Sequence, residues 1–328
     1  MLQPDPPMAI LAQVFALGSV QSMTPIQQGL IQETWRCDTD RGAFIVQKLH
    51  PAFQPTVTED AAAVTDFVRE HGIPAPTFLR TDQGSLHWQQ WRVMTCLPGT
   101  TWTQIPSVDS LHSVGFWTGR LHHVLEAFQA PFQFQLPNFH NTAAIWQQLA
   151  DLEPTAMIAD RRDWLLAMAP QVFLPQSCAT QVIHGDLKIS NFLLDADGHV
   201  VGILDWDTCM RHSVYVDLGD GLRSWCASGS RVNPEALTAA LRGYADSGAL
   251  AQRDPQLIVR GWQLLCVELA MRFVIDAVED RYFQWDAQRF PSRVAHNLAR
   301  ADKHIALVQH IQAQQDEWLG ILTPLFHD

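Results

Sequence analysis

Charged side chains are scarce in this chain of 328 residues, and cations are the scarcer kind. Lys and Arg number 22 against 34 Asp and Glu, which gives a formal net charge of −12. General nucleic-acid binding needs clustered cations that neutralise phosphates, and docking on an anionic membrane needs a basic surface. We therefore expect no nucleic-acid or membrane partner. An acidic field favours a cationic or neutral polar ligand, or a nucleotide whose charge a metal screens.

Cysteine pairs and targeting segments are also missing. The six cysteines are widely spaced and form no C-x-x-C pair, which argues against zinc or thioredoxin-like chemistry. The apolar residues 8–17 have no basic residue before them, because the first is Arg36, so they predict a helix and not a secretory signal. No apolar run approaches the ~20 residues of a membrane span. These features predict a cytoplasmic protein with reduced thiols.

Hydrophobic residues, in contrast, make up 47% of the chain, enough for a sizeable core in two domains or two joined lobes. Three strands within residues 24–49 predict an antiparallel meander, followed by a helix over 59–71 and strands over 78–81 and 87–94. Most of the remainder has helical periodicity, over residues 9–17, 108–128, 141–152, 160–169, 234–247, 255–279 and 294–318. We predict an α+β fold with a small antiparallel-sheet lobe, residues 1–97, and a larger, mostly helical lobe, residues 98–328.

Two short segments beside predicted strands carry the residues for phosphoryl transfer. This reaction needs an oriented hydroxyl, metal ions on the phosphates and a cation near the transferred group. Asp186 is placed to accept or orient an acceptor proton, Lys188 to neutralise the γ-phosphate, and Asn191 to offer an amide oxygen to magnesium. Asp205 follows a strand of Val, Ile and Leu, and its carboxylate would suit magnesium as a second ligand.

Either segment alone would most often be a turn, but their combination is specific. A strand over 181–183 precedes His-Gly-Asp-x-x-x-x-Asn at residues 184–191, and a turn at 195–198 and a strand over 200–204 precede Asp-Trp-Asp at residues 205–207. This order resembles the catalytic plan of protein kinases. No Walker loop and no G-x-S-x-G elbow points to another chemistry.

The two motifs resemble those of the aminoglycoside phosphotransferase and choline kinase superfamily. Its His-Gly-Asp-x-x-x-x-Asn matches residues 184–191, and its Ile-Asp-Trp-Asp-like motif matches residues 204–207. The resemblance implies a two-lobed, protein-kinase-like fold that binds ATP and Mg²⁺ between the lobes and a small-molecule acceptor against the helical lobe.

Further segments resemble the N-acetylhexosamine 1-kinases within that superfamily. They lie at residues 29–34, 45–49, 217–224, 268–273, 282–283 and 296–301. Residues 278–281 read Val-Glu-Asp-Arg where this group often has Gly-Asp, and the nucleotide loop has a single glycine, Gly29, where protein kinases have several. This resemblance implies the anomeric hydroxyl of an N-acetylhexosamine or related sugar as the acceptor.

The resemblance assigns the nucleotide site to the small lobe and the connector. Lys48 would hold the α- and β-phosphates and pair with Glu59, or with Asp60, at the start of the next helix. The backbone of Gly29 would approach the phosphates. The backbone groups of Thr95 and Leu97 would meet adenine. A solvated strand lysine, a helix-dipole carboxylate and a turn glycine are the plain alternatives.

The acceptor site is assigned by the same resemblance. Asp207 would bind a substrate hydroxyl or a second magnesium, Asp217 would support the catalytic loop, and Arg223, Arg272 and Tyr282 would contact the acceptor. Each of the last three is equally compatible with a packing or surface role.

We therefore predict a kinase that transfers the γ-phosphoryl group of ATP to a sugar hydroxyl. An aminoglycoside, choline, homoserine or another amino alcohol is the alternative acceptor. A nucleotide-binding pseudokinase scaffold is the alternative of another class, disfavoured because Lys48, Asp186, Asn191 and Asp205 are all present. The choice between ATP and GTP, and between a monomer and a homodimer, stays open.

Overall fold

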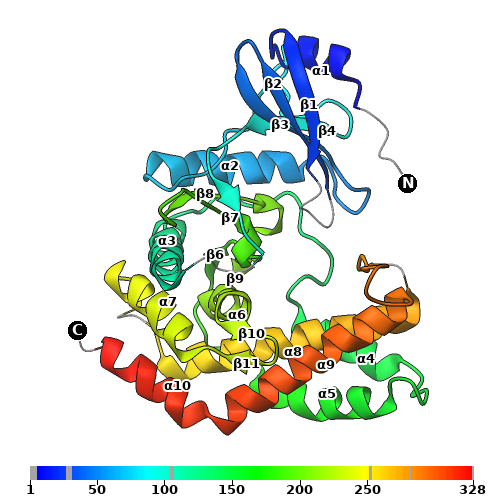
Figure 1. Ribbon diagram of the computed structural model, residues 1–328, viewed down its shortest axis with the longest axis vertical. Coiled ribbons are helices and arrows are strands. Elements are labelled where there is room, and N and C mark those ends of the chain that lie inside the picture. Colours follow the sequence, from blue (N-terminus) through cyan, green and yellow to red (C-terminus); the bar gives the residue numbers. More distant parts are fainter. Residues whose placement is uncertain (1–5, 27–31, 104–106, 251–252, 281, 327–328) are drawn as a thin grey trace.

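The small lobe is built on a four-stranded antiparallel sheet, shown at the top of Figure 1. The structure is a computed structural model that describes residues 6–26, 32–103, 107–250, 253–280 and 282–326. The strands lie in the order β1-β2-β3-β4. Their bounds are β1 Val20–Ile26, β2 Glu33–Thr39, β3 Gly42–Lys48 and β4 Trp91–Thr95.

The two faces of this sheet pack against different partners, because successive side chains of a strand point to opposite faces. Val46, Trp91 and Val93 face helix α1, Met8–Val14, and form a small core with Leu11. Met94 and the partly buried Ile45 belong instead to the main core of the molecule. The second face is therefore the one directed toward the large lobe.

Helix α2, Val57–Glu70, lies between the sheet and the large lobe (Figure 1). Its apolar side, Ala61, Val64 and Val68, is buried in the same continuous core as the large-lobe helices. The packing thus joins the lobes through α2. The predicted boundary at residues 97–98 falls between β4 and the two-residue strand β5, Thr100–Thr101, and stays a prediction.

The large lobe is helical, as the sequence predicted. Helix α8 is its central element and is buried along most of its length, while α9 packs along it (Figure 1). Helices α3 and α7 approach closely at Gly243, which has no side chain. A Cβ at this position would stand 1.9 Å from the His112 carbonyl oxygen. The helices are α3 Val108–Glu126, α4 Thr142–Asp151, α5 Ala159–Val172, α6 Val214–Trp225, α7 Pro234–Asp246, α8 Pro255–Glu279, α9 Arg293–Ala313 and α10 Gln315–Leu322.

Three predicted elements differ from the structure, and one helix of the structure was not predicted. The single helix predicted over 294–318 is broken at Gln314 into α9 and α10, and the break lets Trp318 pack on Trp262 with ring centroids 6.3 Å apart. Helix α6 was missed, since its two glycines lower helix propensity. The strands predicted over 78–81 and 87–94 are reduced to β4 and isolated bridges, one of them between Phe78 and Met94.

Short strands set the loops that carry the motifs. One sheet has the order β5-β7-β8, and a second pairs β6 with β9. The bounds are β6 Gln181–Ile183, β7 Phe192–Leu194, β8 Val200–Ile203, β9 Met210–His212, β10 Ala227–Ser228 and β11 Arg231–Val232, with 3₁₀ turns η1 Ile189–Asn191, η2 Trp206–Thr208 and η4 Thr323–Phe326. None of the helices in the described ranges is long and apolar enough to cross a membrane.

Candidate active site

The two predicted motifs meet in one place. Residues 184–191, named the catalytic loop here for their predicted role, connect β6 to β7. Residues 204–207, named the metal loop for the same reason, follow β8. The backbone N–H of Leu204 donates to the carbonyl of Asn191 at 2.8 Å, and His184 Nε2 lies 2.9 Å from the Leu204 carbonyl. These bonds fix the loops side by side because each links a backbone group of the metal loop to the catalytic loop.

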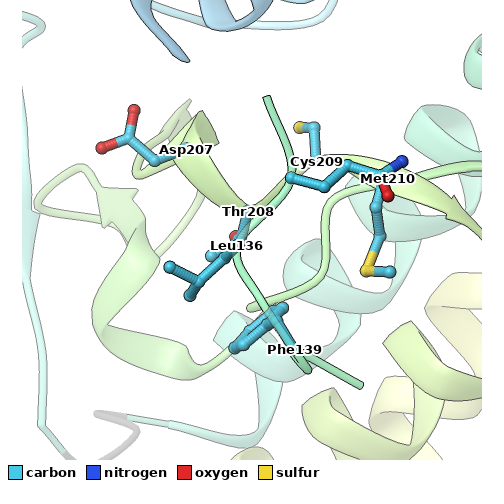
Figure 2. Close-up of a pocket in the computed structure, with 7 residues that line it drawn as sticks. Leu136, Phe139, Asp207, Thr208, Cys209 and Met210 are labelled. Atoms are coloured by element: carbon cyan, nitrogen blue, oxygen red, sulfur yellow. The ribbon is translucent and has the colours of Figure 1, made fainter. Parts of the chain in front are cut away.

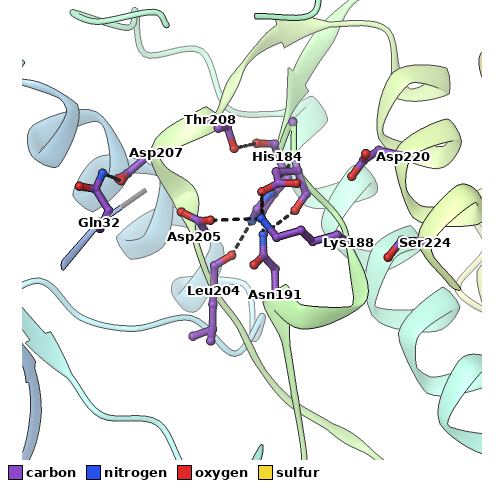
Figure 3. Close-up of polar contacts among 12 residues, drawn as sticks. Gln32, His184, Lys188, Asn191, Leu204, Asp205, Asp207, Thr208, Asp220 and Ser224 are labelled. Atoms are coloured by element: carbon purple, nitrogen blue, oxygen red, sulfur yellow. Dashed lines mark hydrogen bonds and ion pairs between the residues drawn. The ribbon is translucent and has the colours of Figure 1, made fainter. Parts of the chain in front are cut away.

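Lys188 sits at the centre of this arrangement (Figure 3). Its ammonium forms a short ion pair with Asp186 Oδ2 and lies 3.8 Å from Asp205 Oδ2. The Asn191 side-chain nitrogen donates to the Asp186 carbonyl at 2.7 Å and to Asp186 Oδ2 at 3.1 Å. The structure therefore brings together the predicted residues Asp186, Lys188, Asn191 and Asp205.

The electrostatics keep Asp186 ionised. Burial favours the neutral acid, but the Lys188 ammonium outweighs burial and holds the pKa of Asp186 below its usual value. Burial likewise opposes the charge on Lys188, yet Asp186 and Asp205 raise the pKa of this lysine well above its usual value. The loop therefore presents an ionised carboxylate and a fixed cation at neutral pH.

The donor set at Asp205 and Asn191 fits a divalent cation. Asp205 has left-handed backbone geometry, φ +67°, and its side chain is 41% exposed. Crowding by protein atoms and then the neighbouring carboxylates of Asp186 and Asp207 raise the pKa of Asp205, although Lys188 opposes this. A bound cation would relieve this repulsion. The side-chain nitrogen of Asn191 donates to Asp186, so the side-chain oxygen of Asn191 is free to bind such a cation. Hard divalent ions prefer oxygen ligands.

Two buried side chains hold the backbone on both sides of Gly185, the residue immediately before Asp186. Asp217 on α6 accepts the backbone N–H of His184 at 2.8 Å and that of Gly185 at 2.7 Å. His140 approaches from the other side, with Nε2 2.6 Å from the Gly185 carbonyl oxygen. Gly185 has φ +85°, and a Cβ there would lie 2.4 Å from the Thr208 carbonyl oxygen, so only glycine fits.

Lys48 lies away from these loops. Lys48 lies directly across from Glu33 on β2 and from Trp91 on β4, so the three side chains share the sheet face that is directed toward α1. The Lys48 ammonium is 3.6 Å from Glu33 Oε1, and Glu59 Oε1 is 3.6 Å from His87 Nε2. The predicted pairing of Lys48 with Glu59 is therefore not the pairing seen here. The alternative partner, Asp60, accepts the backbone N–H groups of residues 133 and 134 instead.

Asp207 forms an ion pair with an arginine that was not among the predicted site residues. Arg92 on β4 donates to Asp207 Oδ1 at 2.6 Å and to Oδ2 at 2.7 Å. Gln32 also donates to Oδ2, at 3.0 Å. Asp207 is buried, with a side chain 2% exposed, so in this structure it binds the small lobe and does not face solvent as an acceptor ligand would.

Thr95 and Leu97, the residues predicted to contact adenine, lie at the end of β4 and just beyond it. The backbone N–H of Thr95 donates to the Thr77 carbonyl at 2.9 Å, so this group is already used within the lobe. Leu97 lies beyond β4, and its Cδ1 would stand 2.9 Å from a Cβ on Gly202 of β8. Leu97 thus packs directly over the β7–β8 hairpin. Gly29 lies outside the described residues.

The predicted acceptor residues occupy two places. Arg223 on α6 forms a short ion pair with Asp220, and its charge helps to lower the pKa of Asp186. Arg272 on α8 and the half-exposed Tyr282 lie together, with the guanidinium carbon 5.4 Å from the ring centre. The same guanidinium is 5.6 Å from Phe139, a ring that packs beside Gly185.

A small cavity separates Phe139 from the metal loop (Figure 2). Its volume is about 10 Å³, and its lining includes Leu136, Phe139, Thr208 and Met210. This space is of the order of one water molecule. It is therefore too small for a sugar or an amino alcohol.

Comparison with known proteins agrees with this geometry. The model of the phosphotransferase enzyme family (APH) matches residues 22–255, more than half of the chain. The chain belongs to this family. Among curated proteins, the search finds no match.

Solved structures of similar fold include several kinases. Amicoumacin kinase hAmiN in complex with AMP-PNP, Ca2+ and Ami has 16% identity, covers 91% of this phosphotransferase and 92% of its own chain, and gives a TM-score of 0.66. An aminoglycoside phosphotransferase from Alicyclobacillus acidocaldarius has 13% identity, 97% and 98% coverage and a TM-score of 0.67. A microcompartment-associated aminopropanol kinase has 14% identity, 94% and 98% coverage and a TM-score of 0.64. These similarities confirm the predicted two-lobed fold.

Proposed function

We propose that this phosphotransferase moves the γ-phosphoryl group of ATP to a hydroxyl of a small molecule. The observation that carries the proposal is the contact of the Lys188 ammonium with Asp186, 3.8 Å from Asp205. This cluster places an ionised carboxylate, a cation and a candidate metal ligand around one point. Such positioning and charge neutralisation are the main requirements of phosphoryl transfer.

Asp186 would orient the acceptor hydroxyl and take its proton. The acceptor oxygen forms a bond to the γ-phosphorus while the bond from that phosphorus to the β–γ bridging oxygen breaks, and ADP leaves. Lys188 would neutralise charge on the transferred group, since its ammonium is held in the same cluster. Asp205 and Asn191 are the residues that would hold Mg²⁺, which supplies further neutralisation of the phosphates.

For the acceptor we propose a neutral polyhydroxyl compound, with the anomeric hydroxyl of an N-acetylhexosamine or a related sugar as the first candidate. The Arg223–Asp220 ion pair supports this choice, because its charges are balanced within the protein. Asp220 Oδ2 is buried with no hydrogen-bond partner among the described residues, and a substrate hydroxyl could donate to it. The anomeric hydroxyl is more acidic than an ordinary alcohol, so a carboxylate base suffices.

An amino alcohol or aminoglycoside is the second candidate. The kinases of similar fold include one for aminopropanol, and the net charge of −12 suits a cationic acceptor. A coupled ADP-release assay with N-acetylhexosamines, aminoglycosides, choline and aminopropanol separates the candidates. Turnover of a sugar with formation of its 1-phosphate supports the first, whereas turnover of amino alcohols alone rejects it.

Asp186→Asn tests the mechanism directly. The amide keeps the shape but cannot accept the proton, so kcat should fall ~10²-fold or more, in line with the usual contribution of a general base. Binding of Mg·AMP-PNP, measured by calorimetry, serves as the control for an intact nucleotide site. A wild-type protein that binds Mg·ATP but phosphorylates no acceptor would point to the pseudokinase alternative.

A further inference from the structure

We propose that Arg92, and not Lys48, is the cation through which the small lobe acts on the catalytic site. It acts as a positioning residue that anchors Asp207 and thereby fixes Asp205 for the metal. This inference rests on the proposed function, because it assigns Asp205 to the metal that accompanies ATP. It concerns how the small lobe and the metal loop are joined.

The strand register places Lys48 on the sheet face that is directed toward α1, away from the large lobe. Lys48 shares its sheet face with Val46, which is buried against α1. The side chain that β3 directs toward the large lobe at this level is Gln47, whose partner across the ladder is Arg92. The cation on this face is thus supplied by β4, one strand away from the position expected from the resemblance.

Arg92 is fully engaged in a buried network. Its Nε and Nη2 donate to Gln47 Oε1 at 3.0 and 2.7 Å, and both terminal nitrogens donate to Asp207. Gln47 in turn donates to Thr34 Oγ1 at 3.1 Å. The fork geometry of a guanidinium suits this two-point contact, which a lysine could not reproduce.

The burial of the pair separates a positioning role from direct contact with ATP. The Arg92 side chain is 3% exposed and that of Asp207 is 2% exposed. Arg92 therefore offers almost no surface to a phosphate. Asp207, in contrast, stands two residues from Asp205, on the same 3₁₀ turn that Asp205 precedes.

Loss of Arg92 would release a buried carboxylate beside the metal site. Without its arginine, Asp207 would repel Asp205 more strongly, and the left-handed geometry at Asp205 would lose its anchor. Partners that orient a metal ligand typically contribute about 10- to 100-fold to metal affinity.

The test is calorimetric binding of AMP-PNP to the whole protein with and without MgCl₂. For Arg92→Met we expect the gain in affinity that Mg²⁺ confers to fall about 10- to 100-fold, while binding without Mg²⁺ stays close to wild type. Lys48→Met is the matched control and should leave both affinities unchanged. A loss confined to Lys48→Met overturns the inference, and so does an equal loss for Arg92→Met with and without Mg²⁺.

Asp207→Asn and the double variant protect the test against simple misfolding. If Arg92 acts through Asp207, each single variant and the double variant should lose the same Mg²⁺-dependent gain, because they interrupt one pathway. Additive losses overturn the inference. Replacing both charges also avoids an unpaired buried ion, so the double variant should unfold at a higher temperature than Arg92→Met.

No acceptor is present in this binding experiment, so the positioning role of Arg92 can be rejected without rejecting the proposed function. A wild-type protein that binds Mg·AMP-PNP but phosphorylates nothing rejects the proposed function alone. A reversed result for Arg92 and Lys48 rejects the positioning role alone. If Mg²⁺ does not increase wild-type affinity for AMP-PNP, both are rejected.

Discussion

Two buried histidines support the catalytic loop from opposite sides, and their hydrogen bonds require different charges. His122 on α3 acts through Asp217, which holds the N–H groups of His184 and Gly185. His140 acts directly on the carbonyl of Gly185. Gly185, the residue before Asp186, is thus held at its N–H by one support and at its carbonyl by the other.

The His122 support is a neutral imidazole. Nε2 donates to Asp217 at 3.2 Å, and Nδ1 is 2.9 Å from the Tyr244 hydroxyl, which can donate to it. Burial lowers the pKa of His122 despite the nearby carboxylate. Asp217 stays ionised because the His122 and backbone donors outweigh its burial and lower its pKa.

The His140 support is an imidazolium. Its two nitrogens face only acceptors, Glu268 Oε1 at 2.9 Å and the Gly185 carbonyl oxygen at 2.6 Å, so both must carry a proton. Burial opposes this charge, but Glu268 outweighs burial and raises the pKa of His140. The difference teaches that a buried histidine takes its charge from its partners, and we expect the charge of His140, unlike that of His122, to vary with pH in the neutral range.

Removal of Asp217 should have the largest effect. Asp217→Ala leaves two buried N–H groups of the catalytic loop without an acceptor. We expect a loss of roughly 3–5 kcal/mol in the free energy of unfolding and little remaining turnover. Urea unfolding and the ADP-release assay measure the two effects. Near-wild-type turnover would show that the His140 side alone positions Asp186.

His140→Gln should have an intermediate effect that depends on pH. One donor is kept, but Glu268 loses its charged partner, so we expect roughly 2–3 kcal/mol of destabilisation near pH 6. The raised pKa of His140 means that its contribution is full below the ordinary value of 6.5 and is lost as pH rises through the folded-state pKa. The difference from wild type should therefore shrink at alkaline pH.

The contribution of Glu268 to the free energy of unfolding changes with pH in the opposite direction. The pKa of Glu268 is lowered, since His140 outweighs the effect of burial, so its contribution is lost as pH falls through that lowered value. Urea unfolding of wild type and His140→Gln across this pH range checks both limbs. A difference that does not vary with pH would contradict the imidazolium.

His122→Gln should have the smallest effect. Asp217 keeps its two backbone donors, so we expect about 1–2 kcal/mol of destabilisation with little change of kcat. Because His122 is neutral, this loss should be nearly constant from about pH 6 to 8. A loss that grows as pH falls through this range would indicate a charged His122 and remove the contrast with His140.

The local motifs were predictable because their residues lie close together in the sequence. Asp186, Lys188 and Asn191 belong to one loop between short strands, so their meeting follows from the turn itself. The partners of that loop were harder to find. His140 and Glu268 lie far from it in the sequence, so no local pattern connects them to the loop. The roles of these residues stay predictions.

The interpretation of Lys48 shows where sequence reasoning stopped. The alternation of side chains in residues 43–49 places Val46 and Lys48 on one face of the strand. In the structure Val46 is buried against α1, so Lys48 shares the face that α1 covers. The sequence could not say which face α1 would cover. Arg92 was passed over because its partner, Asp207, lies more than a hundred residues away.

The sequence by itself determined the family chemistry, the two-lobed α+β fold and the grouping of Asp186, Lys188, Asn191 and Asp205, because short loops and hydrophobic periodicity depend on neighbouring residues. Only the tertiary structure decided the partners of His140, the burial of Asp207 in its ion pair with Arg92, and the sheet face on which Lys48 lies. These depend on which side chains meet across the core, where removal from water makes each partner decisive.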